Sequence, residues 1–549
     1  MIALGASVAN GGAPSISIPE AGAAVLPAPR GAHIAIVTDH SEATRAAYET
    51  LHAGGNAVDA AITAALTLGV VSPAASGIGG GGFAMVYDAK TKEIAVYDFR
   101  ETAPMGLTAA MLAKGGPEGA VIGVPGEPLG LATLHRAYGK RTLAEDVSPA
   151  ARIAREGFVV GRYLADQTAR YAGEFAKNAQ LSALLLPHGK PRANGDPFVR
   201  SDLAKTIERF GKEGAAPFYR GDIAERLVSA ARKAGSPITL QDFTAYEVKK
   251  RKPLRQTVGD LDVATMPAPS AGGLMLLEAL NVFGAGDASS LKNAGFESSD
   301  YLHRLGQSMR WSTKDRAAFA SDPDFEKGTD KAYADALRPE AIQKRRVEIE
   351  KAPTPKAKTP GEQGTSHLIV VDAEGNIVSL TTTINGPYGA WVIEPETGIL
   401  LNNEMLDFTT GKGSEKSPNR VRGGARPVSS MTPTIIIRNG QPVLSVGGSG
   451  GTRIATGVTQ VAMCRLTFGL DANQCVSAPR IFVTAEGNDL LVDPDVVADV
   501  RAGLKAKGNE VREEMMTTSA MHLVTFGEGG EHTVSAAADP RKSAFALVQ

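Results

Sequence analysis

The chain has 549 residues, of which 43% are hydrophobic and 21% charged, and its formal net charge is -1. This length exceeds the ~250–300 residues at which a single core stops growing, so we expect several domains or a layered fold. Near-neutral charge and 5% aromatic residues argue against nucleic-acid binding, which needs basic patches and stacking rings. The sequence has no 18-residue apolar run, which argues against a membrane span.

The first part of the chain alternates strand and helix patterns. Residues 1–30 predict a flexible leader or a signal-peptide remnant, although a signal peptide is not evident because no Lys or Arg precedes Arg30. A strand is predicted over 32–40. Ser41 is expected to open a helix over 41–55, and an almost wholly apolar helix is expected over 57–71. Two apolar runs within 83–101 predict a hairpin.

The character of the chain changes after a Lys/Pro-rich segment, 351–364, which we expect to be a mobile linker. Before it, helical patterns dominate residues 129–350, with one strand-like insert. After it the pattern is mostly of strands, with one helix. The first strands are expected over 367–373, 376–385, 433–440 and 441–448. The helix is expected over 453–469, and two closing strands over 522–527 and 543–549. The chain therefore reads as an α-rich segment, 31–364, joined to a β-rich segment, 365–549.

Cysteine and histidine usage predicts neither a disulfide framework nor a metal site. Cys464 and Cys475 are the only cysteines; two buried free thiols are the simpler interpretation, and pairing stays open. The nine histidines show no ligand-like spacing. We therefore expect no metal and no cofactor.

Two glycine-rich motifs resemble known nucleotide or esterase signatures. Residues 77–82 satisfy G-x-G-x-x-G, but a helix precedes them and a strand follows, the reverse of a dinucleotide site. Residues 447–451 satisfy G-x-S-x-G after a strand and before a helix, so a serine esterase with Ser449 as nucleophile is an alternative. Only His522 and His532 follow it in the chain as candidate bases. The competing interpretation is that consecutive glycines expose backbone N–H groups suited to an oxyanion hole.

Thr365 stands directly where the strand pattern begins. A threonine hydroxyl is a poor nucleophile without a base. If the bond from Gly364 to Thr365 were cut, the new α-amine, with a reference pKa of about 7.7–8.0, could serve as that base. Taken alone, a Gly-Thr pair at a strand start is usually structural, so this hypothesis needs further support.

Ordered motifs along the whole chain supply that support, because they resemble the γ-glutamyltransferase family. In the second segment these are TSHLIVVDAEGN, LTTTIN, LLNNEMLDF, RPVSSMTPTI and GGSGGTRIATGV; in the first they include GGNAVDAAITAA, GIGGGGF, YDFRETAP, VPGEP and DRAAFASDPDF. The resemblance implies the four-layer αββα sandwich of N-terminal nucleophile hydrolases. It also implies a precursor that cuts itself before Thr365 into a large and a small subunit, which stay together as a heterodimer.

The resemblance also implies roles for individual residues. Thr365 matches the nucleophile, Thr383 the second threonine beside its amine, and Gly450 and Gly451 the oxyanion hole. The remaining matched positions lie around the α-carboxylate and α-amine of the substrate: Arg100, Asn385, Glu404, Asp407, Ser429 and Ser430. Arg100 supplies a positive charge for the carboxylate of such a head group, and Glu404 and Asp407 supply negative charges for its ammonium.

The family resemblance leaves the substrate partly open. It implies small-molecule γ-glutamyl donors such as glutathione, with water, amino acids or peptides as acceptors, and a periplasmic or extracellular location. Residues 408–427 look short for a lid loop, so an open pocket is expected. Cephalosporin and glutaryl acylases of the same family are an alternative, which the combination of Arg100 and Asp407 disfavours. A non-catalytic amino-acid-binding relative, which would never cut before Thr365, is another.

Overall fold

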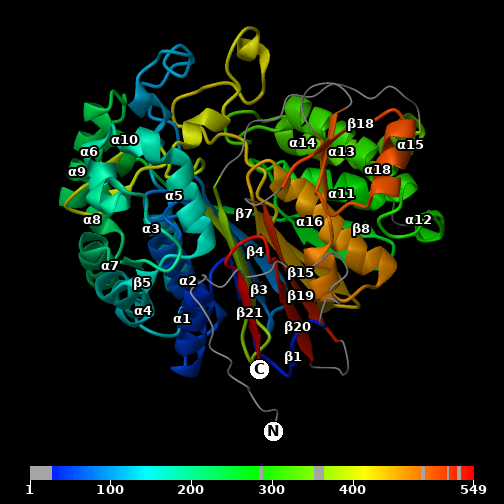
Figure 1. Cartoon of the computed structure of the whole chain (residues 1–549), viewed down its shortest axis with the longest axis horizontal. Coiled ribbons are helices and arrows are strands. Elements are labelled where there is room, and N and C mark those ends of the chain that lie inside the picture. Colours follow the sequence, from blue (N-terminus) through cyan, green and yellow to red (C-terminus); the bar gives the residue numbers. More distant parts are fainter. Residues whose placement is uncertain (1–26, 284–287, 351–363, 484–488, 516–518, 528–532) are drawn as a thin grey trace, which may run out of the picture.

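Two seven-stranded sheets lie face to face at the centre of the molecule, and helices cover their outer faces (Figure 1). This computed structural model describes residues 27–283, 288–350, 364–483, 489–515, 519–527 and 533–549. Most of the expected leader and of the expected linker therefore lies outside the described residues. The order helices, sheet, sheet, helices is the four-layer sandwich expected from the family resemblance.

Both sheets combine strands from the two sides of residue 365. In spatial order, sheet I consists of β21 (Phe545–Val548), β2 (Ala35–Thr38), β10 (Ser366–Val371), β11 (Ile377–Thr383), β3 (Gly81–Asp88), β4 (Glu93–Phe99) and β7 (Lys249–Arg251). Sheet II consists of β1 (Arg30–Gly31), β20 (Val534–Ala538), β19 (Ala520–Phe526), β15 (Gln441–Ser449), β14 (Thr434–Arg438), β9 (Leu261–Thr265) and β8 (Leu254–Val258). All neighbours in both sheets are antiparallel.

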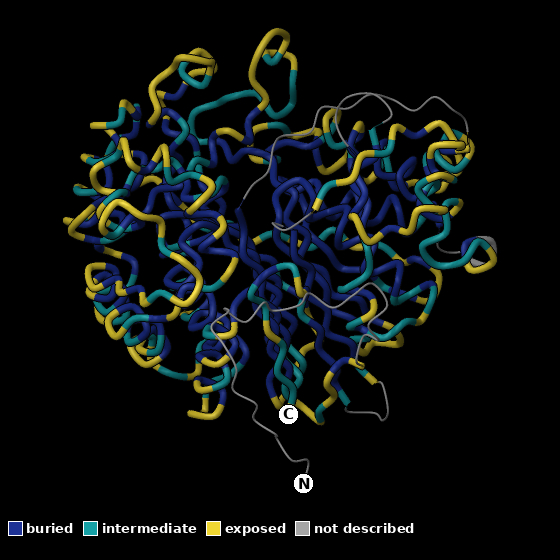
Figure 2. Tube along the Cα trace, in the orientation of Figure 1, coloured by how far each residue is buried: buried dark blue, intermediate teal, exposed yellow. Residues whose placement is uncertain are grey.

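Strand β10 shows why its last four residues, 368–371, are all apolar. Leu368 and Val370 pack into the core between sheet I and the helices, whereas Ile369 and Val371 pack into the core between the two sheets. Successive side chains of a strand point to opposite faces, so a strand covered on both sides has no polar face. The centre of the molecule is correspondingly buried (Figure 2).

The helices form two layers. Sheet I is covered by the first layer, whose main members are α1 (Ser41–His52), α2 (Ala57–Val71), α3 (Glu127–Tyr138), α4 (Leu143–Glu156), α5 (Arg162–Phe175), α6 (Ala179–Leu185), α7 (Ser201–Glu213), α8 (Ala216–Arg220), α9 (Asp222–Lys233) and α10 (Leu240–Thr244). Sheet II is covered by the second layer, with α11 (Gly272–Phe283), α13 (Ser299–Phe319), α14 (Thr329–Ala336), α15 (Pro339–Ile349), α16 (Arg453–Met463), α17 (Ala472–Ser477) and α18 (Ala498–Ala506).

Helix α2 follows directly from its sequence. Asn56 and Asp59 form a capping box, which satisfies free amides at the helix start. All fifteen residues of the helix are buried, as its apolar sequence predicts. Helix α1 begins at Ser41 as predicted, with His40 as the N-cap residue whose ring accepts the Glu42 amide, and it ends at His52, three residues before the predicted end.

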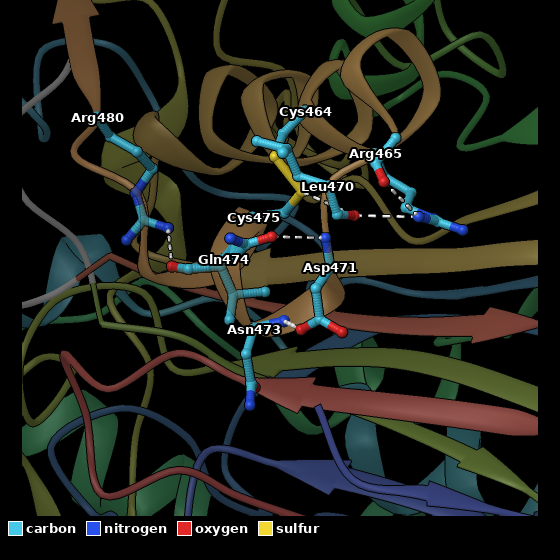
Figure 3. Close-up of a disulfide and its surroundings, with 10 residues drawn as sticks. Cys464, Arg465, Leu470, Asp471, Asn473, Gln474, Cys475 and Arg480 are labelled. Atoms are coloured by element: carbon cyan, nitrogen blue, oxygen red, sulfur yellow. Dashed lines mark hydrogen bonds between the residues drawn. A yellow bond between two sulfur atoms is a disulfide. The ribbon is translucent and has the colours of Figure 1, made fainter. Parts of the chain in front are cut away.

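The two cysteines form a disulfide, so the simpler interpretation as free thiols is wrong (Figure 3). After α16, a π-helical segment, Cys464–Phe468, ends at Gly469 in a left-handed conformation, φ 69°. This reverses the chain, and α17 returns with the two Cα atoms 5.5 Å apart. The reversal depends on the left-handed conformation of Gly469. The separation of 11 residues between the cysteines does not reveal it.

No helix within the described ranges combines the length and the apolar character that crossing a bilayer requires.

Candidate active site

Thr365 and Thr383 come together at the ends of neighbouring strands. Ser366 pairs with Thr382 in the β10–β11 ladder, so the residues flanking this pair are also close. The Thr365 and Thr383 hydroxyls lie 3.4 Å apart. Both donate to the carbonyl oxygen of Gly364, at 2.6 and 2.7 Å respectively. The carbonyl that precedes Thr365 is thus polarised by two hydroxyl groups, and Thr365 is only 2% exposed.

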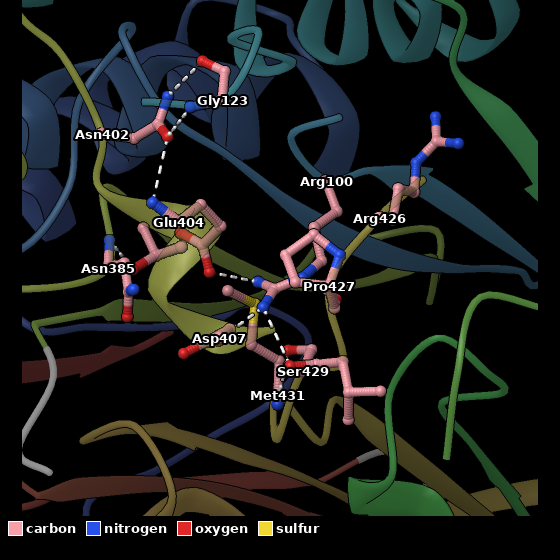
Figure 4. A network of polar contacts seen from close by, with 12 residues as sticks. Arg100, Gly123, Asn385, Asn402, Glu404, Asp407, Arg426, Pro427, Ser429 and Met431 are labelled. Atoms are coloured by element: carbon pink, nitrogen blue, oxygen red, sulfur yellow. Dashed lines mark hydrogen bonds and ion pairs between the residues drawn. The ribbon is translucent and has the colours of Figure 1, made fainter. Parts of the chain in front are cut away.

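Arg100 lies at the centre of a second buried polar group (Figure 4). It follows β4, and its guanidinium pairs with Glu404 and with Asp407, each at 2.6 Å. Both acids belong to a short 3₁₀ helix, Glu404–Asp407, which places them on one side of the arginine. The arginine also donates to the backbone carbonyls of Pro427 and Val428. Charged donors and acceptors are thus matched in a nearly dry environment.

Two glutamates at this cluster, Glu404 and Glu101, have raised pKa values. Burial raises the pKa of Glu404 to about 8, against the attraction of Arg100, and the Asp407 charge raises it further. Burial also raises the pKa of Glu101, the residue after Arg100, and Glu404 adds to that shift. Such shifts are typical of sites where a bound ligand changes the charge balance.

The other residues expected at the substrate surround the same cluster. The Asn385 amide donates to the Thr383 hydroxyl at 2.8 Å, and its side chain donates to the Asn403 carbonyl. Asn385 adopts a left-handed conformation, φ 69°, which is uncommon for a residue with a side chain. Ser429 and Ser430 are buried, and Ser429 directly follows Val428, whose carbonyl accepts from Arg100. The structure therefore brings the candidate substrate residues into one neighbourhood (Figure 4).

Gly450 and Gly451 form the turn between β15 and α16. Their φ angles are 120° and 60°, a region that favours glycine. A Cβ atom on Gly450 would lie 2.7 Å from the Cα of Ser519, so both conformation and space require glycine there. This sharp turn places both glycines directly before α16, and their role as an oxyanion hole stays a prediction.

A buried ion network behind Thr365 was missed by sequence reasoning. Lys542 donates to the Thr365 carbonyl at 2.7 Å, to Asp39 at 3.1 Å and to the Ser449 hydroxyl at 2.8 Å. Asp39 also contacts His522 at 2.8 Å. Burial acts to raise the pKa of Asp39, but Lys542 and His522 outweigh it and hold the pKa well below its usual range. Lys542 stands 177 residues from Thr365 in a turn just before the last strand, so no local pattern could have identified it.

The same network excludes the esterase alternative. Ser449 is fully buried, and its hydroxyl contacts Lys542 and the Ala520 carbonyl instead of a histidine. His522 is held by Asp39 and by the Met521 carbonyl, and His532 lies outside the described residues. A nucleophile elbow needs an exposed serine beside its base, so that interpretation of the G-x-S-x-G motif is wrong.

The pocket around Arg100 is not open in the way the short 408–427 segment suggested. Arg100 is 1% exposed, because Pro427 and Val428 at the end of that segment lie directly against its guanidinium. Residues 409–413 are exposed instead. Although the segment is short, the backbone carbonyls at and just after its end contact Arg100. The length of the segment in the sequence does not show this.

One group of side chains outside the site approaches the arrangement of metal ligands. Ligand atoms of Asp59, His135 and Asp146 lie within 4.8 Å of one another. The Asp59 carboxylate, however, already accepts the backbone amides of Asn56 and Lys140, and the Arg141 guanidinium lies 3.9 Å from Asp146. These contacts give Asp59 a structural role at the start of α2.

Similarity to known proteins identifies the family of this chain. The family model described as gamma-glutamyltranspeptidase matches residues 43–548. The chain belongs to this family. Glutathione hydrolase 2 of Arabidopsis thaliana is 35% identical over 545 residues, which is 93% of each chain. The glutathione hydrolase proenzyme of Escherichia coli (strain K12) is 34% identical over 529 residues, covering 91% of this chain and 89% of that protein.

Structural similarity agrees with the family assignment. Cephalosporin acylase from Bacillus halodurans superposes with a TM-score of 0.86 at 26% identity, covering 98% of this chain and 99% of that one. This gamma-glutamyltranspeptidase family member is thus an enzyme with the N-terminal nucleophile hydrolase fold. The solved acylase shows that the family includes members named for different acyl groups, so the substrate must be argued from the site.

Proposed function

We propose that this family member cleaves itself before Thr365 and then transfers or hydrolyses γ-glutamyl groups from amides such as glutathione. The observation that carries the proposal is the convergence of Thr365 and Thr383 on the Gly364 carbonyl. The Thr365 hydroxyl, held 2.6 Å from the preceding carbonyl oxygen, lies beside the carbonyl group that it would have to attack.

Self-cleavage would proceed as an N→O acyl shift. The Thr365 hydroxyl adds to the Gly364 carbonyl, the C–N bond breaks, and the nitrogen takes the proton to become a free α-amine. Thr383, already a donor to that carbonyl oxygen, would stabilise the negative charge that develops there. Water then hydrolyses the ester, leaving fragments of 364 and 185 residues, the second being 549 minus 364.

The transfer reaction would use the new terminus. The Thr365 hydroxyl attacks the γ-carbonyl of the donor while its own α-amine accepts the proton. The amides of Gly450 and Gly451 stabilise the oxyanion. The C–N bond breaks, the proton passes to the leaving amine, and water or an acceptor amine releases the glutamyl group. Two half-reactions through one ester predict ping-pong kinetics.

The charges around Arg100 suit a glutamyl head group. Its α-carboxylate would pair with Arg100 and accept hydrogen bonds from the hydroxyls of Ser429 and Ser430. Its α-ammonium would pair with Glu404 and Asp407, beside Asn385. Because Arg100 is already paired with both acids, the substrate would insert its own two charges into an existing ion pair. This exchange keeps every buried charge partnered.

The acylase alternative rests on the structural likeness to the Bacillus halodurans enzyme. A plain glutaryl group has no α-ammonium. Binding it would leave Glu404 and Asp407 without the positive partner that a glutamyl group supplies. The acids therefore favour the glutamyl substrate over the glutaryl one.

The disulfide supports a location outside the reducing cytosol. Structural disulfides persist in the periplasm and in extracellular space and are rare in the cytosol. The Cys464–Cys475 bond therefore agrees with the secreted or periplasmic location that we propose.

Intact mass and a γ-glutamyl assay test the proposal. Purified protein is expected to show two fragments divided between Gly364 and Thr365, and to release amine from a γ-glutamyl amide faster than from a glutaryl amide. Thr365→Ala is expected to stay a single chain without activity. A wild-type chain that stays intact on long incubation would disprove the proposal, and a preference for the glutaryl amide would favour the acylase.

A further inference from the structure

One arginine of the motif DRAAFASDPDF, residues 315–325, takes no part in the proposed reaction. Arg316 lies in the last turn of α13, where its carbonyl accepts the Ala320 amide. A cation in the last turn of a helix is favoured by the helix dipole. That effect accounts for an arginine at the end of a helix, but not for the neighbours that this arginine has.

The end of α13 is fixed against the chain segment that contacts Arg100. Asp322, three residues after the helix, accepts the Arg426 amide at 2.8 Å. Arg426 directly precedes Pro427, whose carbonyl accepts from the Arg100 guanidinium at 2.7 Å. The last turn of α13, with Arg316, therefore lies near the candidate substrate cluster.

The following helix, α14, reaches the serine pair of the same cluster. Its Tyr333 hydroxyl donates to the Ser270 carbonyl at 3.1 Å. Ala271, the residue after Ser270, donates its amide to the Ser429 carbonyl at 3.0 Å. Helices α13 and α14 contact each other on one flank of the molecule (Figure 1). Both helices thus approach the place where the proposed function puts the α-carboxylate of the donor.

The charge of Arg316 is not matched by an anion of its own within the described part of the chain. Asp407, Tyr333 and Arg100 are the groups that act on this charge. Asp407 is the only carboxylate of the three, and it is paired with Arg100 at 2.6 Å. The Arg316 side chain is half-buried, and its Nε is buried without a hydrogen-bond partner among the residues that the structure describes.

The two arginines differ in how their burial is compensated. Burial acts to lower the pKa of Arg100, but Glu404 and Asp407 outweigh it. Burial also lowers the pKa of Arg316; there Asp407 and Tyr333 do not outweigh it, and Arg100 lowers the pKa further. A guanidinium stays charged at neutral pH all the same. Because a desolvated charge without a partner is costly, an anionic ligand that reaches Arg316 gains affinity from it.

We infer that Arg316 is a second cation for the α-carboxylate of the γ-glutamyl donor, beside Arg100. This inference deepens the proposed function and rests on it. A carboxylate has two oxygens and can accept from two guanidinium groups at once. When the donor replaces Asp407 at Arg100, its carboxylate supplies the anion that Arg316 lacks, and Asp407 pairs with the α-ammonium. Arg316 binds and orients the donor, and no bond forms or breaks at it.

Two donors that differ only in the α-carboxylate test this inference. They are γ-glutamyl-4-nitroanilide and 4-aminobutanoyl-4-nitroanilide, and the measured quantity is the ratio of their kcat/KM values. In Arg316→Met this ratio is expected to fall about tenfold, the effect of one lost charge-assisted hydrogen bond, mainly through a higher KM for the glutamyl donor. Arg316→Lys keeps the charge without the planar fork and should recover part of the loss. The matched control Lys314→Met removes an exposed cation from the same helix and leaves the ratio unchanged.

A ratio that stays unchanged in Arg316→Met, or an equal loss for both donors, would overturn the inference. Thermal unfolding of the variants separates binding from a role at the helix end. A lower melting temperature with an unchanged ratio would mean that the arginine is purely structural. If Arg316→Met does not fold, the ratio in Arg316→Lys decides, and a value equal to that of the wild type overturns the inference.

Binding of the free head group gives a readout independent of catalysis. Isothermal titration of the wild-type enzyme is expected to show tighter binding of L-glutamate than of 4-aminobutanoate. Arg316→Met should weaken only the binding of L-glutamate, by about tenfold. If the wild type cleaves neither donor, the proposed function fails, whereas this titration still decides about Arg316. Equal affinity for L-glutamate in both chains, or no binding of L-glutamate, would overturn the inference.

Discussion

Arg100 contacts two acids, Glu404 and Asp407, and the first of them has a raised pKa. The pKa of Glu404 is raised to about 8, first by burial and then by Asp407, while Arg100 opposes the shift. Around neutral pH this side chain is therefore largely protonated, and it becomes an anion as pH rises through 8. An anion at this position would attract the α-ammonium of the donor.

We therefore expect the KM for a γ-glutamyl donor to fall by up to about tenfold between pH 7 and 9, as the ionised fraction of a group with a pKa of about 8 rises over that range. In Glu404→Gln, which stays neutral, KM should be higher at pH 9 and lose this dependence. Initial-rate kinetics across the pH range measure it, with exposed Glu415→Gln as control. A pH effect on kcat alone would assign the titration to the Thr365 amine instead.

The contribution of Thr383 to self-cleavage can be tested by itself. Its hydroxyl donates to the Gly364 carbonyl at 2.7 Å. Thr383→Val keeps the shape of the side chain but removes the donor, so self-cleavage should slow about a hundredfold, as for a lost oxyanion-hole donor. The half-time is followed by intact mass, and Thr383→Ser should restore it. Equal rates in the valine and wild-type chains would show that Thr383 does not assist cleavage.

At the scale of elements, the last strand ties the site to the rest of the fold. Lys542, just before β21, reaches the Thr365 carbonyl, Ser449 and Asp39. The pKa of Asp39 is held low by Lys542 and His522 against burial. This carboxylate therefore contributes stability above its unfolded pKa of about 3.9, and the contribution is lost as pH falls through the folded value.

In Lys542→Met the buried carboxylate loses its main partner, so we expect stability to fall by about 3–5 kcal/mol. Acid unfolding should move to higher pH, because the native pKa of Asp39 rises. Denaturant unfolding at several pH values measures both effects. Lys542→Arg keeps the charge and should recover most of the resistance to acid unfolding. If Lys542→Met is as stable to acid as the wild type, the result would argue against the network.

Sequence reasoning reached the elements that depend on local pattern. Apolar runs predict helix α2 and strands β10 and β11, and the family resemblance implies the roles of Thr365 and Arg100, which stay predictions. What it missed depends on contacts distant in sequence. The disulfide needs the reversal at Gly469, and the Lys542 network joins residues 39, 365, 449 and 542, which no local pattern connects.

At the scale of the whole molecule, the two expected fragments are interleaved. In sheet I, β10 lies between β2 and β11, and β11 pairs with β3. In sheet II, β14 of the second fragment pairs with β9 of the first. Separating the fragments would expose long unpaired strand edges and both apolar cores, a cost far greater than that of the single peptide bond lost by cleavage.

We therefore expect the fragments of 364 and 185 residues to remain one particle after cleavage, with the 57.1 kDa mass of the uncut chain. Size-exclusion chromatography with light scattering should give one peak under native conditions, whereas a denaturing gel of the same fraction shows two bands. Thr365→Ala is the uncut control and should elute at the same volume. Separate native peaks for the two fragments would mean that the interleaved sheets do not hold the cleaved enzyme together.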